Sequence, residues 1–302
     1  MSRLFFMLSR WPLAVLHQLG SLLGWLAYLL SPSYRRRLKA HTRAAGMGLW
    51  QRWAAVAHAG KMVGELPRLW GRPREQALGE AVQWRHPEVV DQALSEGRGL
   101  LLLTPHLGCF EITAQAYAER FGALKPITAL YRPAKQAWLA DMMRDSRNRP
   151  GMLTSPATLS GVRNMLRALK KGETVGLLPD QVPPEGMGVW TDFFGRPAYT
   201  MTMAAKLVAQ TGCAVVLLRG ERLGLLARWR QGCDYIVHAT RVAPDVEQVL
   251  ASGDAAQSAA AVNRLMEAMI MQAPEQYLWG YNRYKQPRAE ILTSAAGGQA
   301  PT

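Results

Sequence analysis

Acidic residues are scarce in this chain and are missing altogether from its amino-terminal part. The 302 residues include 22 Asp and Glu against 36 Lys and Arg, which gives a net charge of +14 and a pI near 10.1. No Asp or Glu precedes Glu65, so the basic bias is strongest at the amino end. This charge indicates an anionic partner, which is nucleic acid, a membrane surface or an acidic protein.

Cysteine is also rare, and the three cysteines Cys109, Cys213 and Cys233 have neither paired nor metal-binding spacing. That pattern argues against a disulfide framework and a zinc site, and it is typical of a reducing compartment. Cys109 could be proposed as a nucleophile, because it lies three residues after His106. We favour a buried packing residue, since free cysteine behaves mostly as a small apolar side chain.

The chain contains no Gly-x-Ser-x-Gly sequence, which argues against an α/β hydrolase with a serine nucleophile. It has no internal repeat and no extended low-complexity region. A hydrophobic fraction of 49% with 19% charged residues excludes disorder for most of the chain. The length allows one large α/β domain or two small ones.

Residues 11–30 carry no formal charge and have Trp and Tyr near their ends. About 20 apolar residues suffice to span a bilayer, so a transmembrane anchor, an interfacial helix and a secretory signal all compete for this segment. A signal peptide is disfavoured because Arg35, Arg36 and Arg37 follow it without a cleavage site. We expect membrane association over residues 1–33, with the following chain in the cytoplasm by the positive-inside bias. A buried amphipathic helix is the remaining alternative.

Beyond this segment, residues 34–70 have helical periodicity. In the sequence that follows, short apolar runs alternate with segments of helical pattern. This alternation predicts an α/β fold with a mainly parallel sheet flanked by helices over residues 34–293, followed by a disordered tail over 294–302. A hairpin is expected at the sheet edge, where residues 223–230 and 233–240 flank Gln231-Gly232. Residues 245–272 are expected to form the last helix. The predicted strands are 100–103, 127–131, 175–178, 214–218 and 235–238, and the predicted helices between them are 111–121, 136–147, 158–171 and 201–210.

His106 and Glu111 follow the first of these strands and are the best candidates for catalysis. A His and a carboxylate five positions apart across a strand-to-helix turn can converge, so that Glu111 holds one ring nitrogen of His106 and the other takes a proton. Pro105 and Gly108 shape the turn, which lies at the carboxyl end of a strand, where α/β sheets place their ligands. A solvated ion pair or a helix N-terminal acid is the ordinary alternative.

Further polar residues follow later strands. Asp180 and Gln181 come after the strand 175–178, where Asp180 either caps a loop or binds polar groups of a substrate. Guanidinium groups bind phosphate well, so the arginines after the strand 127–131 are candidates for a phosphorylated lipid, although a solvated basic face is the usual meaning of such a run. These candidates are Arg132, Arg147 and Arg149, with Arg283 and Lys285 at a membrane-facing rim.

Taken together, these motifs resemble the late (secondary) lipid A biosynthesis acyltransferases, the HtrB/LpxL-like branch of the lysophospholipid acyltransferase superfamily. The resemblance covers nearly the whole chain and is carried by Thr104-Pro-His-Leu-Gly-Cys-Phe-Glu111, Tyr131-Arg-Pro133, Leu178-Pro-Asp-Gln181, Phe193-Phe-Gly195 and Ala273-Pro-Glu-Gln-Tyr-Leu-Trp279 with Arg283 and Lys285.

The resemblance implies an inner-membrane enzyme, active on the cytoplasmic face, that moves an acyl chain from acyl carrier protein to a hydroxyl of a lipid A precursor. His106 and Glu111 match the family's His-x4-acid motif, Asp180 matches the acid after the later strand, and Arg147 matches an active-site arginine. No cofactor and no metal are needed, because His106 can deprotonate the hydroxyl directly. Backbone N–H groups at the helix start after Gly108 are candidates for binding the oxyanion.

Two alternatives stay open at this point. Within the superfamily, the acceptor could be another membrane aminolipid or a glycolipid. In a different class, the high pI is compatible with a basic nucleic-acid-binding protein, but that class does not account for the apolar segment 11–30.

Overall fold

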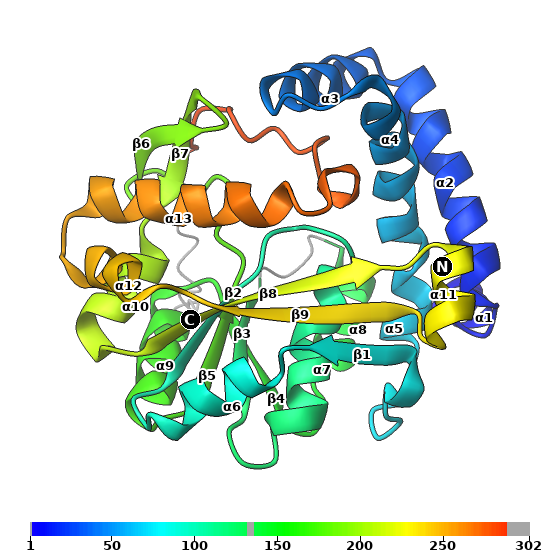
Figure 1. The fold of residues 1–302 in the computed structure, drawn as a ribbon. Helices are drawn as coiled ribbons and strands as arrows, with labels where there is room; N and C mark the ends of the chain where they lie inside the picture. Colours follow the sequence, from blue (N-terminus) through cyan, green and yellow to red (C-terminus); the bar gives the residue numbers. More distant parts are fainter. Residues whose placement is uncertain (1, 132–135, 289–302) are drawn as a thin grey trace, which may run out of the picture.

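A seven-stranded, mainly parallel sheet with helices on both faces forms the body of the molecule (Figure 1). The computed structural model describes residues 2–131 and 136–288. The strand order is β1-β9-β8-β2-β5-β3-β4, and the only antiparallel neighbours in this sheet, within the described residues, are β8 and β9. The predicted fold class is therefore confirmed. The strands of the sheet are β1 (Val82–Arg85), β2 (Leu100–Leu103), β3 (Ile127–Tyr131), β4 (Met152–Pro156), β5 (Thr174–Leu177), β8 (Ala214–Arg222) and β9 (Tyr235–Arg241).

Helices cover both faces of the sheet, and its central strands carry hydrophobic side chains on both sides. In β2, Leu101 and Leu103 belong to one core and Leu100 and Leu102 to the other, as the two-residue period of a strand requires. The helices α9 (Leu159–Lys170), α10 (Met203–Thr211), α12 (Pro244–Ala251) and α13 (Ala255–Ile270) contribute to the first core, and α6 (Glu88–Ser95) and α7 (Phe110–Phe121) to the second.

The helices before the sheet form a separate layer at one side of it (Figure 1). They are α1 (Ser2–Ser9), α2 (Leu13–Leu30), α3 (Pro32–Ala44), α4 (Leu49–Gly64) and α5 (Leu66–Trp70). Among the described helices, α2 alone is long and apolar enough to cross a membrane. Its length and composition agree with the predicted membrane segment, but this helix is packed against α4 along one face.

Glycine makes the contact between α2 and α4 very close. A Cβ placed on Gly60 would lie 1.8 Å from the carbonyl oxygen of Gly20, and one on Gly24 would lie 2.4 Å from that of Val56. Only hydrogen fits at these positions, so the two backbones touch directly.

Several elements differ from the sequence-based expectations. The segment expected as the first strand of the 223–240 hairpin is the helix α11 (Leu225–Gln231), because Gly224 and Gly232 cap it and Gly232 adopts a left-handed φ of 66°. The hairpin partner of β9 is instead the extended strand β8.

The expected helix over 245–272 is two helices, α12 and α13. Gly253 has a φ of 81°, and Asp254 caps α13 by accepting hydrogen bonds from the amides of Ala256 and Gln257. The sequence analysis did not anticipate the strands β1 and β4 or the hairpin of β6 (Gly188–Phe193) and β7 (Arg196–Met201). The unexpected strand β4 follows the helix α8 (Ala137–Arg147). The predicted tail over 294–302 lies outside the described residues.

Candidate active site

His106 and Asp180 are brought together by the register of two neighbouring strands. Strands β2 and β5 are parallel, with Leu103 opposite Leu177, and each candidate residue follows its strand by three positions. The Nδ1 atom of His106 lies 2.7 Å from Oδ1 of Asp180, and the backbone N–H of His106 donates to Oδ2 at 2.9 Å. Both carboxylate oxygens of Asp180 are thus directed at His106.

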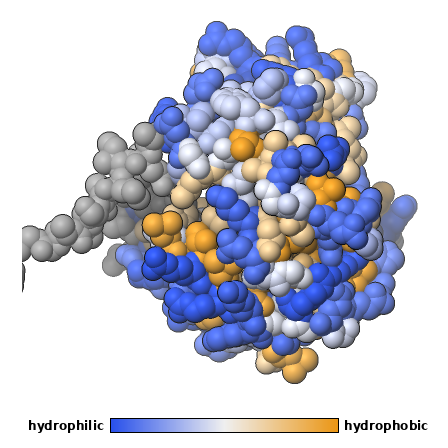
Figure 2. Space-filling view, turned by 90° about the vertical axis from the view of Figure 1, so that its left-hand side faces the viewer, coloured by the Kyte–Doolittle hydropathy of each residue, from blue (hydrophilic) through white to orange (hydrophobic). Residues whose placement is uncertain are grey.

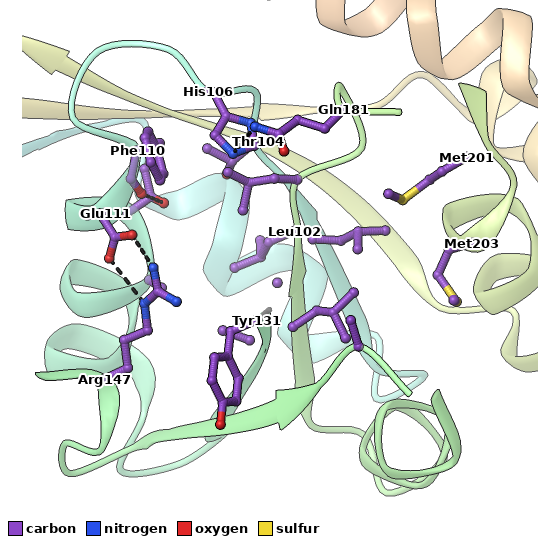
Figure 3. Close-up of a pocket in the computed structure, with 18 of the residues that line it drawn as sticks. Leu102, Thr104, His106, Phe110, Glu111, Tyr131, Arg147, Gln181, Met201 and Met203 are labelled. Carbon is purple, nitrogen blue, oxygen red and sulfur yellow. Dashed lines mark hydrogen bonds and ion pairs between the residues drawn. The ribbon is translucent and has the colours of Figure 1, made fainter. Parts of the chain in front are cut away.

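The Asp180 carboxylate defines the tautomer of the imidazole, because a carboxylate can only accept. The Nδ1–H of His106 donates to it, which leaves the Nε2 lone pair as the basic position. Burial alone would raise the pKa of Asp180, but the charge and hydrogen bonds of His106 outweigh burial and hold that pKa below its usual value. The amide Nε2 of Gln181 lies 3.1 Å from Nε2 of His106 and donates to it (Figure 3).

This geometry corrects two of the sequence-based assignments. Glu111 does not orient His106: it accepts hydrogen bonds from Arg147 and, at 3.3 Å, from the indole N–H of Trp70 (Figure 3). The reason is that α7 begins at Phe110, which turns Glu111 toward α5 and α8. Asp180 in turn faces the imidazole and not a substrate, since its side chain is only 1% exposed.

The turn between β2 and α7 is fixed by backbone and side-chain contacts from distant segments. Gly108 has a φ of 60°, and a Cβ there would lie 1.9 Å from the carbonyl oxygen of Gly220. The N–H groups of Gly108 and Cys109 donate to the carbonyl oxygens of Gln276 and Gly220. Those two amides are therefore not available to an oxyanion, and of the amides expected after Gly108 those of Phe110 and Glu111, at the start of α7, stay candidates.

A deep, mostly apolar pocket of about 500 Å³ opens beside His106 (Figure 3). It lies at the carboxyl ends of β2, β3 and β5, where the sequence predicted the site. Polar side chains of His106, Glu111, Arg147 and Gln181 occupy one part of its wall. The apolar remainder of the wall includes Leu102, Ile127, Ala129, Met143, Val162, Leu178, Met201 and Met203.

The other predicted binding residues lie elsewhere. The buried Arg149 guanidinium donates to backbone carbonyl oxygens, among them those of Pro73 at 2.8 Å and Ser146 at 2.8 Å. Arg283 is also buried and donates to the carbonyl oxygen of Tyr199 and to Oγ1 of Thr200, both at 2.7 Å. Both arginines hold loops together.

Two predicted binding residues remain. The ammonium group of Lys285 lies 5.2 Å from the ring centre of Tyr281. Arg132 lies outside the described residues. Arg147 is therefore the predicted arginine that the described structure places in the pocket.

A buried ion pair behind the site was missed by the sequence analysis. Arg222 at the end of β8 binds both carboxylate oxygens of Glu65 and also donates to the carbonyl oxygen of Gly108 at 2.9 Å. Burial would raise the pKa of Glu65, but Arg222 and the hydrogen bond from His17 of α2 hold it below its usual value. The only sequence signal was that Glu65 is the first acid in the chain.

Cys109 lies next to this ion pair and is 1% exposed. Burial raises the pKa of its thiol well above the usual value, so the thiolate is disfavoured. The interpretation of Cys109 as a packing residue is confirmed.

A His–Asp pair beside a mostly apolar pocket lies at the carboxyl edge of the mainly parallel sheet, which is where enzymes with this class of fold bind their ligands. Residues 51–286 match the family described as bacterial lipid A biosynthesis acyltransferase, and the chain belongs to that family. The resemblance noted in the sequence is thus confirmed.

The curated relatives are consistent with this family. The chain is 29% identical over 209 residues to a lipid A biosynthesis palmitoleoyltransferase of Escherichia coli K12, covering 67% of this chain and 62% of the relative. It is 28% identical to the lipid A biosynthesis lauroyltransferase of the same strain, covering 66% of this chain and 60% of that relative. A lipid A biosynthesis acyltransferase of Haemophilus influenzae is 28% identical over 193 residues, covering 64% and 55%. The matched stretch therefore spans less than two thirds of each relative.

Proposed function

We propose that this protein is an acyltransferase of lipid A biosynthesis that moves a fatty acyl chain from acyl carrier protein to a hydroxyl of a lipid A precursor. The observation that carries the proposal is the His106–Asp180 pair at the mouth of an apolar pocket, in a chain of this family. The relatives are named for the transfer of palmitoleoyl and lauroyl groups, which are long apolar chains.

In this proposal, His106 acts as the general base. A secondary hydroxyl has a pKa far above 7 and is a poor nucleophile, so it needs a base as it attacks the thioester carbonyl. The hydroxyl takes the place of the Gln181 amide at Nε2 of His106, and its proton moves to Nε2 as the new C–O bond forms. Asp180 stabilises the imidazolium. When the tetrahedral intermediate collapses, the C–S bond breaks and the imidazolium returns the proton to the leaving thiolate.

The acyl chain occupies the apolar part of the pocket, whose lining suits hydrocarbon. Direct transfer without an acyl-enzyme is favoured, because Cys109 is buried and its thiolate is disfavoured. Arg147, held by Glu111, supplies a positive charge in the pocket wall for an anionic oxygen of the reacting groups.

The charge and hydropathy of the chain support the proposed location and partners. Acyl carrier proteins are acidic, so a chain of net charge +14 attracts them electrostatically. The exposed apolar side of α2 supports attachment to the inner membrane, with the α/β body on the cytoplasmic side.

The direct test is mass spectrometry of lipid A from cells that lack this protein and from cells that carry the wild type or His106→Ala. We expect lipid A to lose one acyl chain in the first and third strains, with the missing mass identifying the chain. Thermal unfolding of purified His106→Ala should match the wild type. Unchanged lipid A with a missing chain on an aminolipid or glycolipid would instead assign the acceptor to another lipid.

A further inference from the structure

The amino-terminal helix α2 has two very different sides. Leu13, Leu16, His17, Gly20 and Gly24 are buried, while the remaining surface is almost wholly apolar and exposed. The exposed side chains include Val15, Leu19, Leu22, Leu23, Leu26, Leu29 and Leu30. An apolar surface of this extent on a basic protein indicates a contact with another apolar phase or partner.

A second exposed apolar group comes from a distant part of the sequence. Leu225, Leu226 and Trp229 of α11 are 60%, 61% and 82% exposed. The helix α11 lies beside the start of α2 (Figure 1), and Leu225 and Trp229 line a shallow groove together with Ala14 of α2 and the acidic residues Glu80 and Asp234. Phe6 and Met7 of α1, the helix just before α2, are exposed as well.

The charges around these helices favour a lipid surface over a protein. No acidic residue occurs before Glu65, and exposed basic residues lie at both ends of α2, including Arg10, Arg36 and Lys39, while Arg230 is exposed on α11. Leucine and tryptophan bordered by arginine and lysine are typical of elements that lie in the headgroup region of anionic bilayers. The opposite side of the molecule is mostly hydrophilic, with apolar side chains only in smaller groups (Figure 2).

The packing of α2 is incompatible with a helix that crosses the bilayer. Gly20 and Gly24 touch α4 directly, and the imidazole Nε2 of His17 lies 3.2 Å from Glu65 at the end of α4. The α/β body lies alongside α4 (Figure 1), so a spanning α2 would bring Arg52 and Lys61 of α4 and part of that body to the depth of the hydrocarbon core.

We propose that α1, α2 and α11 form one membrane-contact face, which lies flat in the headgroup region of a bilayer containing anionic phospholipid, and that α2 does not cross the bilayer. The proposal rests on the proposed membrane location of the enzyme and is independent of acyl transfer. It names α11, about 200 residues after α2, as a second membrane-contact element.

Cysteine labelling tests the orientation of α2 in the full-length protein. Arg10→Cys and Ser33→Cys place a thiol at either end of α2, and Cys109, Cys213 and Cys233 are buried, so the unchanged protein serves as the background control. A membrane-impermeant maleimide should label both positions in inverted membrane vesicles and neither in intact spheroplasts. Labelling of the two positions from opposite sides of the membrane would overturn the proposal.

Vesicle binding tests the contribution of α11. Purified Leu226→Glu/Trp229→Glu is compared with Leu124→Glu/Leu159→Glu, which adds the same charge at exposed leucines outside the proposed face. Flotation with phosphatidylethanolamine and phosphatidylglycerol vesicles should show at least about tenfold weaker binding for the α11 variant, because each inserted large apolar side chain contributes on the order of a factor of ten.

The control variant should bind like the wild type, and near-UV circular dichroism of both variants should be unchanged. Wild-type binding by the α11 variant, or equal loss in both variants, would overturn the role of α11 and assign its exposed side chains to a protein partner. Acyl transfer is not measured in either experiment, so failure here is distinct from failure of the proposed function.

Discussion

Asp180 and Glu111 both lie near His106 in the structure, but they have different surroundings. Asp180 is almost fully buried and offers both oxygens to His106, whereas Glu111 offers both of its oxygens to Arg147. In the proposed reaction, Asp180 is therefore the residue that orients the base, and Glu111 is a positioning residue for Arg147. The spacing of five residues in the sequence had suggested that Glu111 orients His106.

This division of roles gives a first prediction. Asp180→Asn should lower kcat by about 10³- to 10⁴-fold, because the amide NH2 of asparagine can donate to Nδ1 of His106 and so favour the wrong tautomer of the imidazole. Glu111→Gln should lower it by about 10²-fold, because only the position of an electrostatic group is disturbed. Steady-state kinetics of the two purified variants beside the wild type measures both losses. A larger loss of kcat in Glu111→Gln than in Asp180→Asn would restore Glu111 as the orienting residue.

The pH dependence of stability is the second prediction. The folded-state pKa values of Asp180 and Glu65 are lower than their ordinary values of 3.8 and 4.5, so the unfolded chain binds more protons at acidic pH. Their contribution to stability is fully present above these ordinary values and is lost as the pH falls through the lower folded values. Urea unfolding should show that the difference in free energy between the wild type and Asp180→Asn shrinks below pH 3.8. Asp141→Asn, in an exposed pair with Arg144, is the control and should differ little at any pH.

At the level of elements, the central part of the fold was predictable from the sequence. The strands β2, β3, β5, β8 and β9 are short apolar runs, and most of the helices between them have a clear apolar period. The elements that were missed have weak or contrary local signals. In the β6–β7 hairpin, Phe194 at the turn has a φ of 48°, which a bulky residue rarely adopts. The apolar residues of α11 are exposed in the fold, and their pattern in the sequence is that of a strand, so this helix was predicted as a strand.

The candidate site was predictable only in part, for a related reason. His106, Asp180 and Gln181 follow strands, and Arg147 ends a helix, whose positions the sequence indicated. Which acid contacts the imidazole depends on the pairing of β2 with β5, which no local pattern reveals. The structural roles of Arg149 and Arg283 depend on loop carbonyl oxygens that only the folded chain brings within reach.

The contact between α2 and α4 gives a third prediction. Gly60→Ala should lower the free energy of unfolding by about 3 kcal/mol, because the added methyl group would overlap the carbonyl oxygen of Gly20 and separate the helices. Gly48→Ala, at the start of the same helix, meets only a flexible glutamine side chain at 3.7 Å and should change stability by less than about 1 kcal/mol. Thermal unfolding in one detergent compares them, and equal midpoints would show that the close packing is absent in solution.

At the scale of the whole molecule, the net charge of +14 has two proposed uses, the attraction of an acidic donor protein and contact with anionic lipid. Of these two uses, only the attraction of the donor protein affects the KM for a soluble donor. The two can therefore be separated by kinetics.

A fourth prediction concerns this long-range attraction. When salt is raised from about 0.05 M to 0.3 M, the KM for acyl-acyl carrier protein should rise several-fold while kcat changes little, because salt screens charges across the encounter distance. A neutral acyl thioester of N-acetylcysteamine is the control donor, and its KM should not respond to salt. An equal response for both donors would place the salt effect at the lipid acceptor or in the fold.

The contacts of His17 with Glu65, and of Glu65 with Arg222, make α2 part of the folded body. A chain shortened at Pro32 would leave α4 without its glycine-packed neighbour and would open the Glu65–Arg222 ion pair to water, next to the turn that carries His106. Purification without detergent is better approached by replacing the exposed leucines of α2, such as Leu22 and Leu26, with glutamine or lysine, while Leu16, His17 and the glycines stay unchanged. The amino-terminal helix is a structural part of the enzyme. Its exposed surface can be redesigned, but the helix itself cannot be removed.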